Sequence, residues 1–227
     1  ASDWSSDVCS SDLGVAVEGD FDQVLNLLKT KDVKAKVAPK VKAKLAKIDL
    51  SKMSLELCQF MDADLRGANL SEANLTQCNF KGTDLRGANL DRALAPKAMF
   101  AAANLTGASF VKAKCREALF AEANADGADF SEADLAMTVW LKAKAIAASF
   151  RSADLTYAEL SHFNVTDADF SGATLMRARM HRTIEDRAKF GPSRALAFGA
   201  DGVQPRAQLV MRAPEALARK NIGLRSG

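Results

Sequence analysis

The chain has 227 residues, of which 48% are apolar and 26% are charged, enough for one or two domains with a sizeable buried core. Its 31 basic and 28 acidic side chains leave a net charge of +3, which is too small to indicate a nucleic-acid-binding protein. The absence of any run of about 18 apolar residues excludes a membrane-spanning helix, and four scattered cysteines do not make a disulfide scaffold.

Residues 1–13 are interpreted as an artefact. Within them, residues 3–13 (DWSSDVCSSDL) resemble one reading frame of a sequencing-library adapter, and such segments are left out of fold reasoning. Their Ser and Asp content also fits a polar, disordered terminus. On the adapter interpretation Trp4 and Cys9 carry no function and the natural N-terminus is missing. A longer protein, with this chain as its C-terminal part, is compatible with the sequence.

Residues 14–50 are predicted to form an N-terminal helical cap. Apolar side chains recur there at helical spacing, at Phe21, Val24, Leu25 and Leu28. Pro39 is expected to kink or end the helix. A row of lysines between Lys29 and Lys47 fits either a solvated helix face, which we favour, or a surface for a membrane or a nucleic acid. Because stacked strands need their open end covered, a cap is the expected role.

A five-residue repeat fills residues 51–180 without a change of phase. Between positions 65 and 180 every fifth residue is a centre, Leu or Phe in 17 of 24 cases, and the residue two before it is Ala in 20 of 24. A period of five fits neither a helix nor a strand. It predicts short extended segments separated by corners, in units that must stack to bury their side chains.

Centres twenty residues apart resemble each other, which predicts four units per coil. One face carries Phe60, Phe80, Phe100, Phe120 and Trp140, and the opposite face carries Phe110, Phe130, Phe150 and Phe170. The two remaining faces carry mostly smaller centres. The repeat therefore predicts an all-β solenoid of about six coils, with two aromatic walls in a core about 29 Å long.

The units A-D-L-R-G, A-N-L-S-E, A-N-L-T-Q, A-D-F-S-E and A-D-L-T-Y resemble those of the pentapeptide repeat family. The resemblance covers about residues 55–180. It implies a right-handed quadrilateral β-helix with four pentapeptides per coil. The flanking residues add the expected N-terminal helical cap and an irregular C-terminal tail. Because members of the family have diverse roles, it implies little about function.

Residues 181–227 are predicted to be a basic C-terminal tail in which the repeat is lost. Glycine and proline punctuate it, and residues 214–221 are compatible with one short helix. Its nine basic and four acidic side chains give a net charge of +5. Such a tail fits a mobile, solubilising end, or a segment that binds an acidic partner.

The sequence predicts no catalytic, metal or cofactor site. Phosphate-binding, dinucleotide-binding and C-x-x-C motifs are absent. His162 and His181 lie about one coil apart and can approach each other, but no cysteine or carboxylate stands beside them at metal-ligand spacing. Cys58 and Cys78 fall at inward positions on adjacent coils, and their parallel side chains are expected to stay buried thiols rather than form a disulfide.

One face of the predicted rod carries apolar residues at outward positions. The residue before a centre is usually Asp, Asn or Ser, but before Phe100, Phe120 and Trp140 it is apolar, and so is the outward residue that follows. Ala95 is expected at the edge of this face. The candidate interaction stripe comprises Met99, Leu119, Val139, Leu141, Ala101, Ala121 and Leu94. A grouped apolar patch usually marks a contact surface.

Two kinds of cover for the stripe stay open. One is another molecule, either a protein partner or a second copy in a homodimer. The other is the chain's own termini. In that case the cover is either the N-terminal helix or the C-terminal segment, through Phe190, Leu196, Phe198, Leu209 and Val210.

The favoured function is a non-enzymatic scaffold or protein–protein interaction module, without cofactor, nucleic acid or membrane as partner and with an expected cytoplasmic location. The alternative borrows from family members that resemble DNA and act on type II topoisomerases. That mechanism needs a strongly acidic rod, whereas residues 51–180 hold 14 basic and 16 acidic side chains. An enzyme is the third possibility, and no group of residues supports it.

Overall fold

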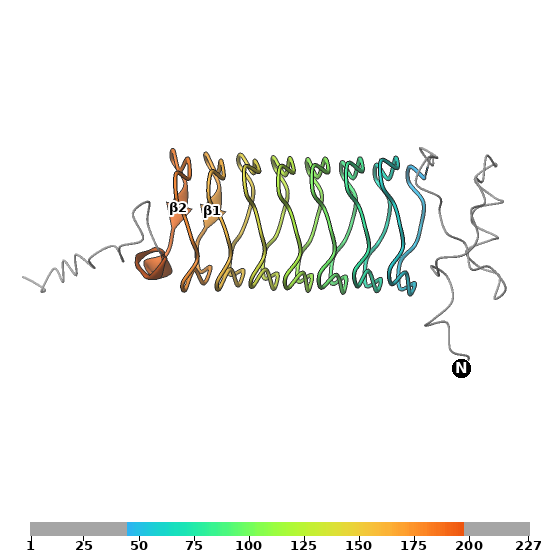
Figure 1. Ribbon diagram of the computed structural model, residues 1–227, viewed down its shortest axis with the longest axis horizontal. Helices are drawn as coiled ribbons and strands as arrows, with labels where there is room; N and C mark the ends of the chain where they lie inside the picture. The colour runs from blue at the N-terminus through green and yellow to red at the C-terminus, as the bar shows by residue number, and fades with distance from the viewer. Residues whose placement is uncertain (1–44, 198–227) are drawn as a thin grey trace, which may run out of the picture.

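The computed structural model describes residues 45–197, which wind into a stack of coils that forms an elongated rod (Figure 1). Residues pair in parallel with those twenty positions later, from Asp49 with Asn69 to Asn164 with Ile184. Strands β1 (Asp169–Phe170) and β2 (Lys189–Phe190) keep the same register. The predicted coil of four five-residue units is therefore confirmed. Residues 45–197 contain no α-helix, and thus none able to cross a membrane.

A corner follows every centre of the repeat. The second residue of each corner has a positive φ, between 53° and 75°, at 29 consecutive corners from Lys47 to Arg187, and 23 of these residues are not glycine. The next amide donates to the carbonyl three residues earlier, as Ala68 does to Leu65 at 3.0 Å, which is the pattern of a type II turn. Because the left-handed conformation disfavours non-glycine residues by about 1–2 kcal/mol each, stacking between coils must hold these corners.

Main-chain hydrogen bonds satisfy four of the five amides in a typical unit. In residues 69–73, three amides donate to the neighbouring coils and one closes the corner, at 2.7–3.2 Å. The remaining amide, of Ser71, has no main-chain acceptor. One amide per unit, the first of each corner, therefore needs a partner from elsewhere, and this requirement shapes the surface of the rod.

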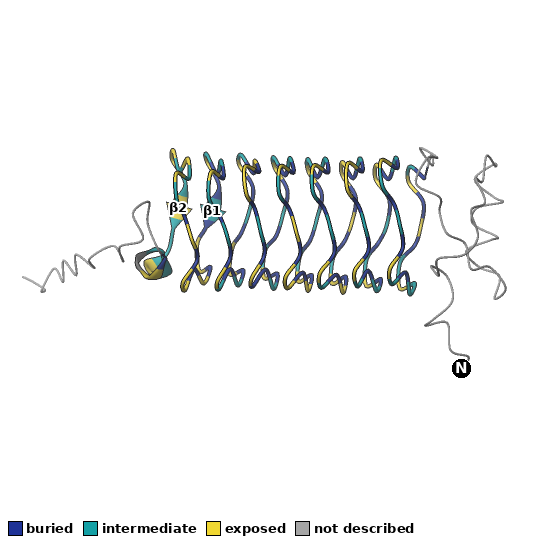
Figure 2. Cartoon of the chain, in the orientation of Figure 1, coloured by how far each residue is buried: buried dark blue, intermediate teal, exposed yellow. Residues whose placement is uncertain are grey.

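Two aromatic columns run through the core, as the spacing of the centres predicts. In the first, Phe60, Phe80, Phe100, Phe120 and Trp140 stack with ring centroids 4.1–5.0 Å apart. In the second, Phe110, Phe130, Phe150, Phe170 and Phe190 stack at 4.6–5.2 Å. The columns meet edge to face at 5.2–6.2 Å. Buried positions accordingly recur in each coil (Figure 2).

The rod begins earlier than residue 51. Leu45, Ile48 and Leu50 are buried, and Lys47 has the left-handed φ of a corner residue, 61°. The prediction that residues 45–50 belong to a helical cap is therefore wrong. Ile48 occupies the small inward position that alanine fills elsewhere, which conceals the repeat in the sequence. The rest of the predicted cap, and the adapter-like segment, lie outside the described residues.

The rod also continues past residue 180, contrary to the predicted loss of the repeat at 181. Ile184 pairs with Asn164, and the ring of Phe190 stacks on Phe170 at 4.9 Å. Glu185 stands where an apolar centre is expected, and this substitution hides the phase. The rod is consequently longer than the six coils expected from residues 65–180.

A short 3-10 helix, η1 (Pro192–Leu196), lies against the last coil. The amide of Arg177 donates to the carbonyl of Leu196 at 3.0 Å, and the Arg194 guanidinium donates to Glu185 at 2.8 Å. Glu185 is thus tolerated at a centre position because a cation reaches it at the end of the stack. The predicted helix at 214–221 and the rest of the basic tail lie outside the described residues.

Candidate interaction surface

Two of the three inward cysteines are buried, unreactive thiols. Cys58 is disulfide-bonded, so the expectation that it stays a thiol is wrong. Cys78 and Cys115 are free and buried, and Cys78 therefore forms no disulfide with Cys58, as expected. Burial raises the pKa of both thiols to about 12, which keeps them in the unreactive protonated form at neutral pH. The Cys78 thiol donates to the carbonyl of Leu55 at 2.7 Å.

The two histidines meet, as their spacing predicts. The rings of His162 and His181 lie 5.9 Å apart at an interplanar angle of 80°. Across residues 45–197, however, no group of three His, Cys, Asp or Glu side chains is arranged to hold a metal ion. The histidine pair therefore does not form a metal centre with its described neighbours.

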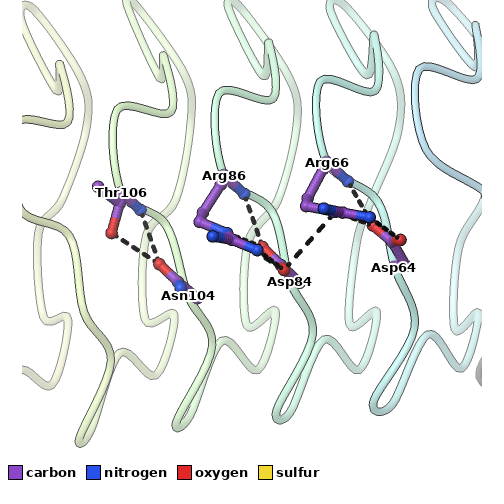
Figure 3. Close-up of polar contacts among 6 residues, drawn as sticks. All are labelled: Asp64, Arg66, Asp84, Arg86, Asn104 and Thr106. Atoms are coloured by element: carbon purple, nitrogen blue, oxygen red, sulfur yellow. Dashed lines mark hydrogen bonds and ion pairs between the residues drawn. The ribbon is translucent and has the colours of Figure 1, made fainter.

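The outward Asp and Asn residues supply the acceptor that each corner lacks. At fourteen corners the side-chain oxygen of Asp or Asn accepts the amide two residues later, at 2.9–3.3 Å. Figure 3 shows three successive caps, ending with Asn104 and Thr106. The sequence pattern predicts that these positions face outward, but their capping role was not predicted. Asx turns of this kind fulfil that role generally.

Two arginines strengthen the caps on one face. Arg66 contacts Asp64 at 2.7 Å, Arg86 contacts Asp84 at 2.7 Å, and Arg66 also reaches Asp84 at 3.8 Å, as drawn in Figure 3. The hydrogen bond from each arginine lowers the pKa of its aspartate. Because these groups are close to solvent, their ion pairs contribute little individually.

The lowered aspartate pKa values predict acid sensitivity. A carboxyl whose pKa is lower in the folded than in the unfolded chain contributes stability above its ordinary value of 3.8 and loses it as pH falls through the folded pKa. We expect a melting temperature that is nearly flat from pH 7 to about pH 5 and falls below about pH 4.

The matched variant is Asp64→Asn with Asp84→Asn, which keeps both caps and removes both charges. Its melting temperature should fall less steeply below about pH 4 than that of the parent. A pH profile identical to that of the parent would show that these pairs do not contribute. Differential scanning fluorimetry across the pH range measures both curves.

The structure aligns most of the predicted stripe. Met99, Leu119 and Val139 pair with one another on successive coils, and the corners that follow them begin with Ala101, Ala121 and Leu141. Leu119 and Leu141 are each 39% exposed, and the other four are half-buried. We call these six residues the apolar stripe. Its ladder is bounded by Asn79 and Glu159.

The apolar stripe lacks the caps found elsewhere. No described oxygen accepts the amide of Ala101, Ala121 or Leu141, because the side chains two residues earlier are hydrocarbon or thioether. At two other uncapped units an aspartate on the preceding coil substitutes, so that Asp91 accepts from Val111 and Asp126 from Ile146. The stripe receives no such substitute. It therefore combines exposed apolar area with three unpaired amides in line.

Leu94 and Ala95 do not join the stripe. Leu94 lies on the preceding face, where its ladder neighbours are Asn74 and Lys114, and Ala95 is buried. The corner after Leu94 begins with Pro96, which has no amide to cap. An apolar residue at Leu94 consequently sacrifices no hydrogen bond, and the structure explains it without a contact surface.

One apolar neighbour of the stripe was missed. Met137 was not among the predicted stripe residues. It is 45% exposed and lies at the corner just before Val139. The Arg116 guanidinium lies 3.5 Å from its sulfur. The sequence does contain a signal for it: Met137 is the second residue of a corner, and in most other units of the rod that residue is polar or small.

Two of the residues proposed to cover the stripe are placed elsewhere. Phe190 belongs to the second aromatic column, stacked on Phe170, and Leu196 is 54% exposed in η1 at the end of the rod. The expectation that these two residues cover the stripe is therefore wrong. Phe198, Leu209, Val210 and the N-terminal helix lie outside the described residues.

Comparison with known families and structures agrees with this architecture. A family model described as a pentapeptide repeat region matches residues 53–130, and one described as pentapeptide repeats (8 copies) matches residues 148–184. Together they cover about half of the chain. No curated protein sequence matches it.

Solved structures similar to this chain have low sequence identity to it. HetL, a pentapeptide repeat protein involved in heterocyst differentiation regulation in the cyanobacterium Nostoc, is 21% identical with a TM-score of 0.54, and the match covers 72% of this chain and 92% of HetL. QnrB1, a plasmid-mediated fluoroquinolone resistance protein, is 19% identical with a TM-score of 0.37 over 63% of this chain and 79% of its own. The HetL similarity concerns the fold alone, and the QnrB1 similarity is too low to support an argument.

Proposed function

The chain belongs to the pentapeptide repeat family, and from that premise we propose that it is a non-enzymatic interaction module whose rod presents the apolar stripe to a protein. The described coils supply an elongated surface on which side chains line up from coil to coil (Figure 1). Within residues 45–197, Cys78 and Cys115 are buried thiols, and the rings of His162 and His181 belong to no group of three possible metal ligands. Binding is the function that such a surface supports.

The observation that carries the proposal is the missing row of caps. Asp or Asn before a corner satisfies the free amide and faces water, and fourteen corners use that solution. Three successive coils replace it with Met99, Leu119 and Val139. Each replacement forgoes a hydrogen bond worth about 0.5–1.5 kcal/mol and exposes apolar area. Desolvation against a protein partner would offset both losses.

The alternative of DNA mimicry is not supported by the charge of the rod. Residues 45–197 contain 19 basic and 19 acidic side chains, so the described part has no net charge. Duplex DNA presents one phosphate charge per ~1.7 Å of axis. Lys112, Lys114 and Arg116 also interrupt any acidic path along the middle coils.

The double variant Leu119→Asp with Val139→Asp tests the proposal. Aspartate at these positions is compatible with the fold, because it would cap Ala121 and Leu141 as Asp64 caps Arg66. We therefore expect the isolated variant to melt at or above the temperature of the parent. Any complex made through the stripe should be lost, because two carboxylates would be buried without partners. Sedimentation and thermal melting measure the two effects.

The matched control is Asn104→Asp with Asn124→Asp, which adds the same charge on the adjacent face and keeps its caps. The control should retain every complex that the parent forms. Unchanged association in the stripe variant, or equal loss in both variants, would contradict a contact through the stripe.

A further inference from the structure

We propose that the occupant of the apolar stripe is a second copy of this chain, packed face to face and antiparallel, with Leu119 on the two-fold axis. The inference rests on the proposed function and adds the identity of the partner. It follows from the spacing, register and polar ends of the ladder that contains the stripe.

The ladder is periodic along the rod. Its residues pair at every coil from Gln59 to Arg179, which spaces successive side chains by about 4.8 Å. A surface with a different repeat would fall out of step within two or three coils. A second copy has the same repeat by construction, so each row of side chains can pack between rows of the other rod.

Only one antiparallel register matches apolar residues with apolar residues. With Leu119 on the axis, Met99 opposes Val139 of the other copy. A shift of the axis by half a coil in one direction places Met99 against Glu159, and in the other direction it places Asn79 against Val139. The ladder sequence thus selects Leu119 as the centre of symmetry.

The polar ends of the ladder favour the same arrangement. Around Leu119, Asn79 opposes Glu159 and Gln59 opposes Arg179, so that an amide faces a carboxylate and a guanidinium at each end. In a parallel pair, Glu159 would oppose Glu159 and Arg179 would oppose Arg179. Arg179 also reaches Glu159 of its own rod at 3.6 Å, which reduces the repulsion between these like charges. The antiparallel pair is still the more favourable one at these ends, because it places an uncharged amide opposite each of the charges.

The corner rows beside the ladder are compatible with this pairing. Ala101 opposes Leu141, a small residue against a large one, and Ala121 opposes itself beside the axis. On the other edge, Glu117 of one rod faces Glu117 of the other. Each Glu117 forms an ion pair with Lys97 of its own rod at 3.7 Å. The four side chains are therefore neutral in sum, and the edge does not repel.

Disulfide trapping of the full chain tests the register. Because Cys58 is itself disulfide-bonded, the background carries Cys9→Ser and Cys58→Ala. In it, Leu119→Cys should give a covalent dimer of twice the 24.3 kDa chain mass under mild oxidation. Met99→Cys combined with Val139→Cys should also give it, because these positions oppose each other. Met99→Cys alone should remain monomeric. In the antiparallel pair the two copies of residue 99 are offset along the rod by two coils, or ~10 Å, which is too far for a disulfide. Asn124→Cys, on the adjacent face, is the control.

Each outcome decides between arrangements. Trapping by Leu119→Cys and by the double variant, without trapping by Met99→Cys alone or Asn124→Cys, supports the antiparallel pair. Equal trapping by Met99→Cys alone indicates a parallel pair and overturns the proposal. If no stripe variant exceeds Asn124→Cys, the partner is not a second copy. The interaction function would then still stand if Met99 is protected in cells that produce the protein, and fall if it is not.

Discussion

Replacing Phe120 with alanine is expected to lower the free energy of unfolding by about 3–5 kcal/mol, the usual loss for a buried phenylalanine truncation. The ring lies between Phe100 at 4.9 Å and Trp140 at 4.1 Å in its own column. It also contacts Phe110 and Phe130 edge to face at 6.2 and 5.9 Å. Alanine would remove four ring contacts in the middle of the rod. Denaturant or thermal unfolding measures the loss.

Phe190→Ala is the matched control at the end of the second column. Phe190 is half-buried and stacks on one ring, Phe170, so its truncation should have a clearly smaller effect. Because repeat units couple only to their neighbours, Phe120→Ala should also open the middle coils locally. Equal losses at the two positions would contradict a core organised as stacked columns.

Thr138→Val is expected to lower the free energy of unfolding by about 1–3 kcal/mol, although the two side chains have the same shape. The Thr138 hydroxyl donates to the Leu135 carbonyl at 2.6 Å and accepts the indole N–H of Trp140 at 3.0 Å. Both residues are fully buried. Valine would leave the indole N–H unpaired in the core, where the missing acceptor cannot be replaced by water.

A double-mutant cycle with Trp140→Phe isolates this hydrogen bond. Phenylalanine keeps the stack and removes the donor, so Thr138→Val should cost less in that background than in the parent. Thr138→Ser retains the hydroxyl and should lose only about 0.5–1.5 kcal/mol for one methyl group. The same loss for Thr138→Val in both backgrounds would refute the indole–hydroxyl bond.

The register and the core were predictable because the repeat is strict. A centre at every fifth residue and phenylalanine at every twentieth leave one way to stack the units, and the columns through Phe120 and Phe130 follow from it. The ends were not predictable in the same way. Ile48 at a small position and Glu185 at a centre break the pattern, although neighbouring coils and Arg194 accommodate them.

The site was predictable in composition and less so in meaning. The alignment of Met99, Leu119 and Val139 follows directly from the twenty-residue period. The capping role of Asp and Asn could not be predicted from the period, because it depends on which main-chain amide the coil leaves without an acceptor. Leu94 looked equivalent to Leu119 in the sequence, yet Pro96 after it removes the amide at issue. The difference between a harmless apolar residue and an exposed uncapped one is a matter of main-chain hydrogen bonding.

Oxidative footprinting of the native methionines tests the contact through the apolar stripe most directly. Met99 lies in the stripe, and Met176, 46% exposed outside it, is an internal reference. Their modification rates are compared in dilute purified protein and in intact cells that produce it. We expect Met99 to be protected in cells relative to Met176, because a protein covers the stripe there. The same Met99 to Met176 ratio in both samples would contradict the proposed contact.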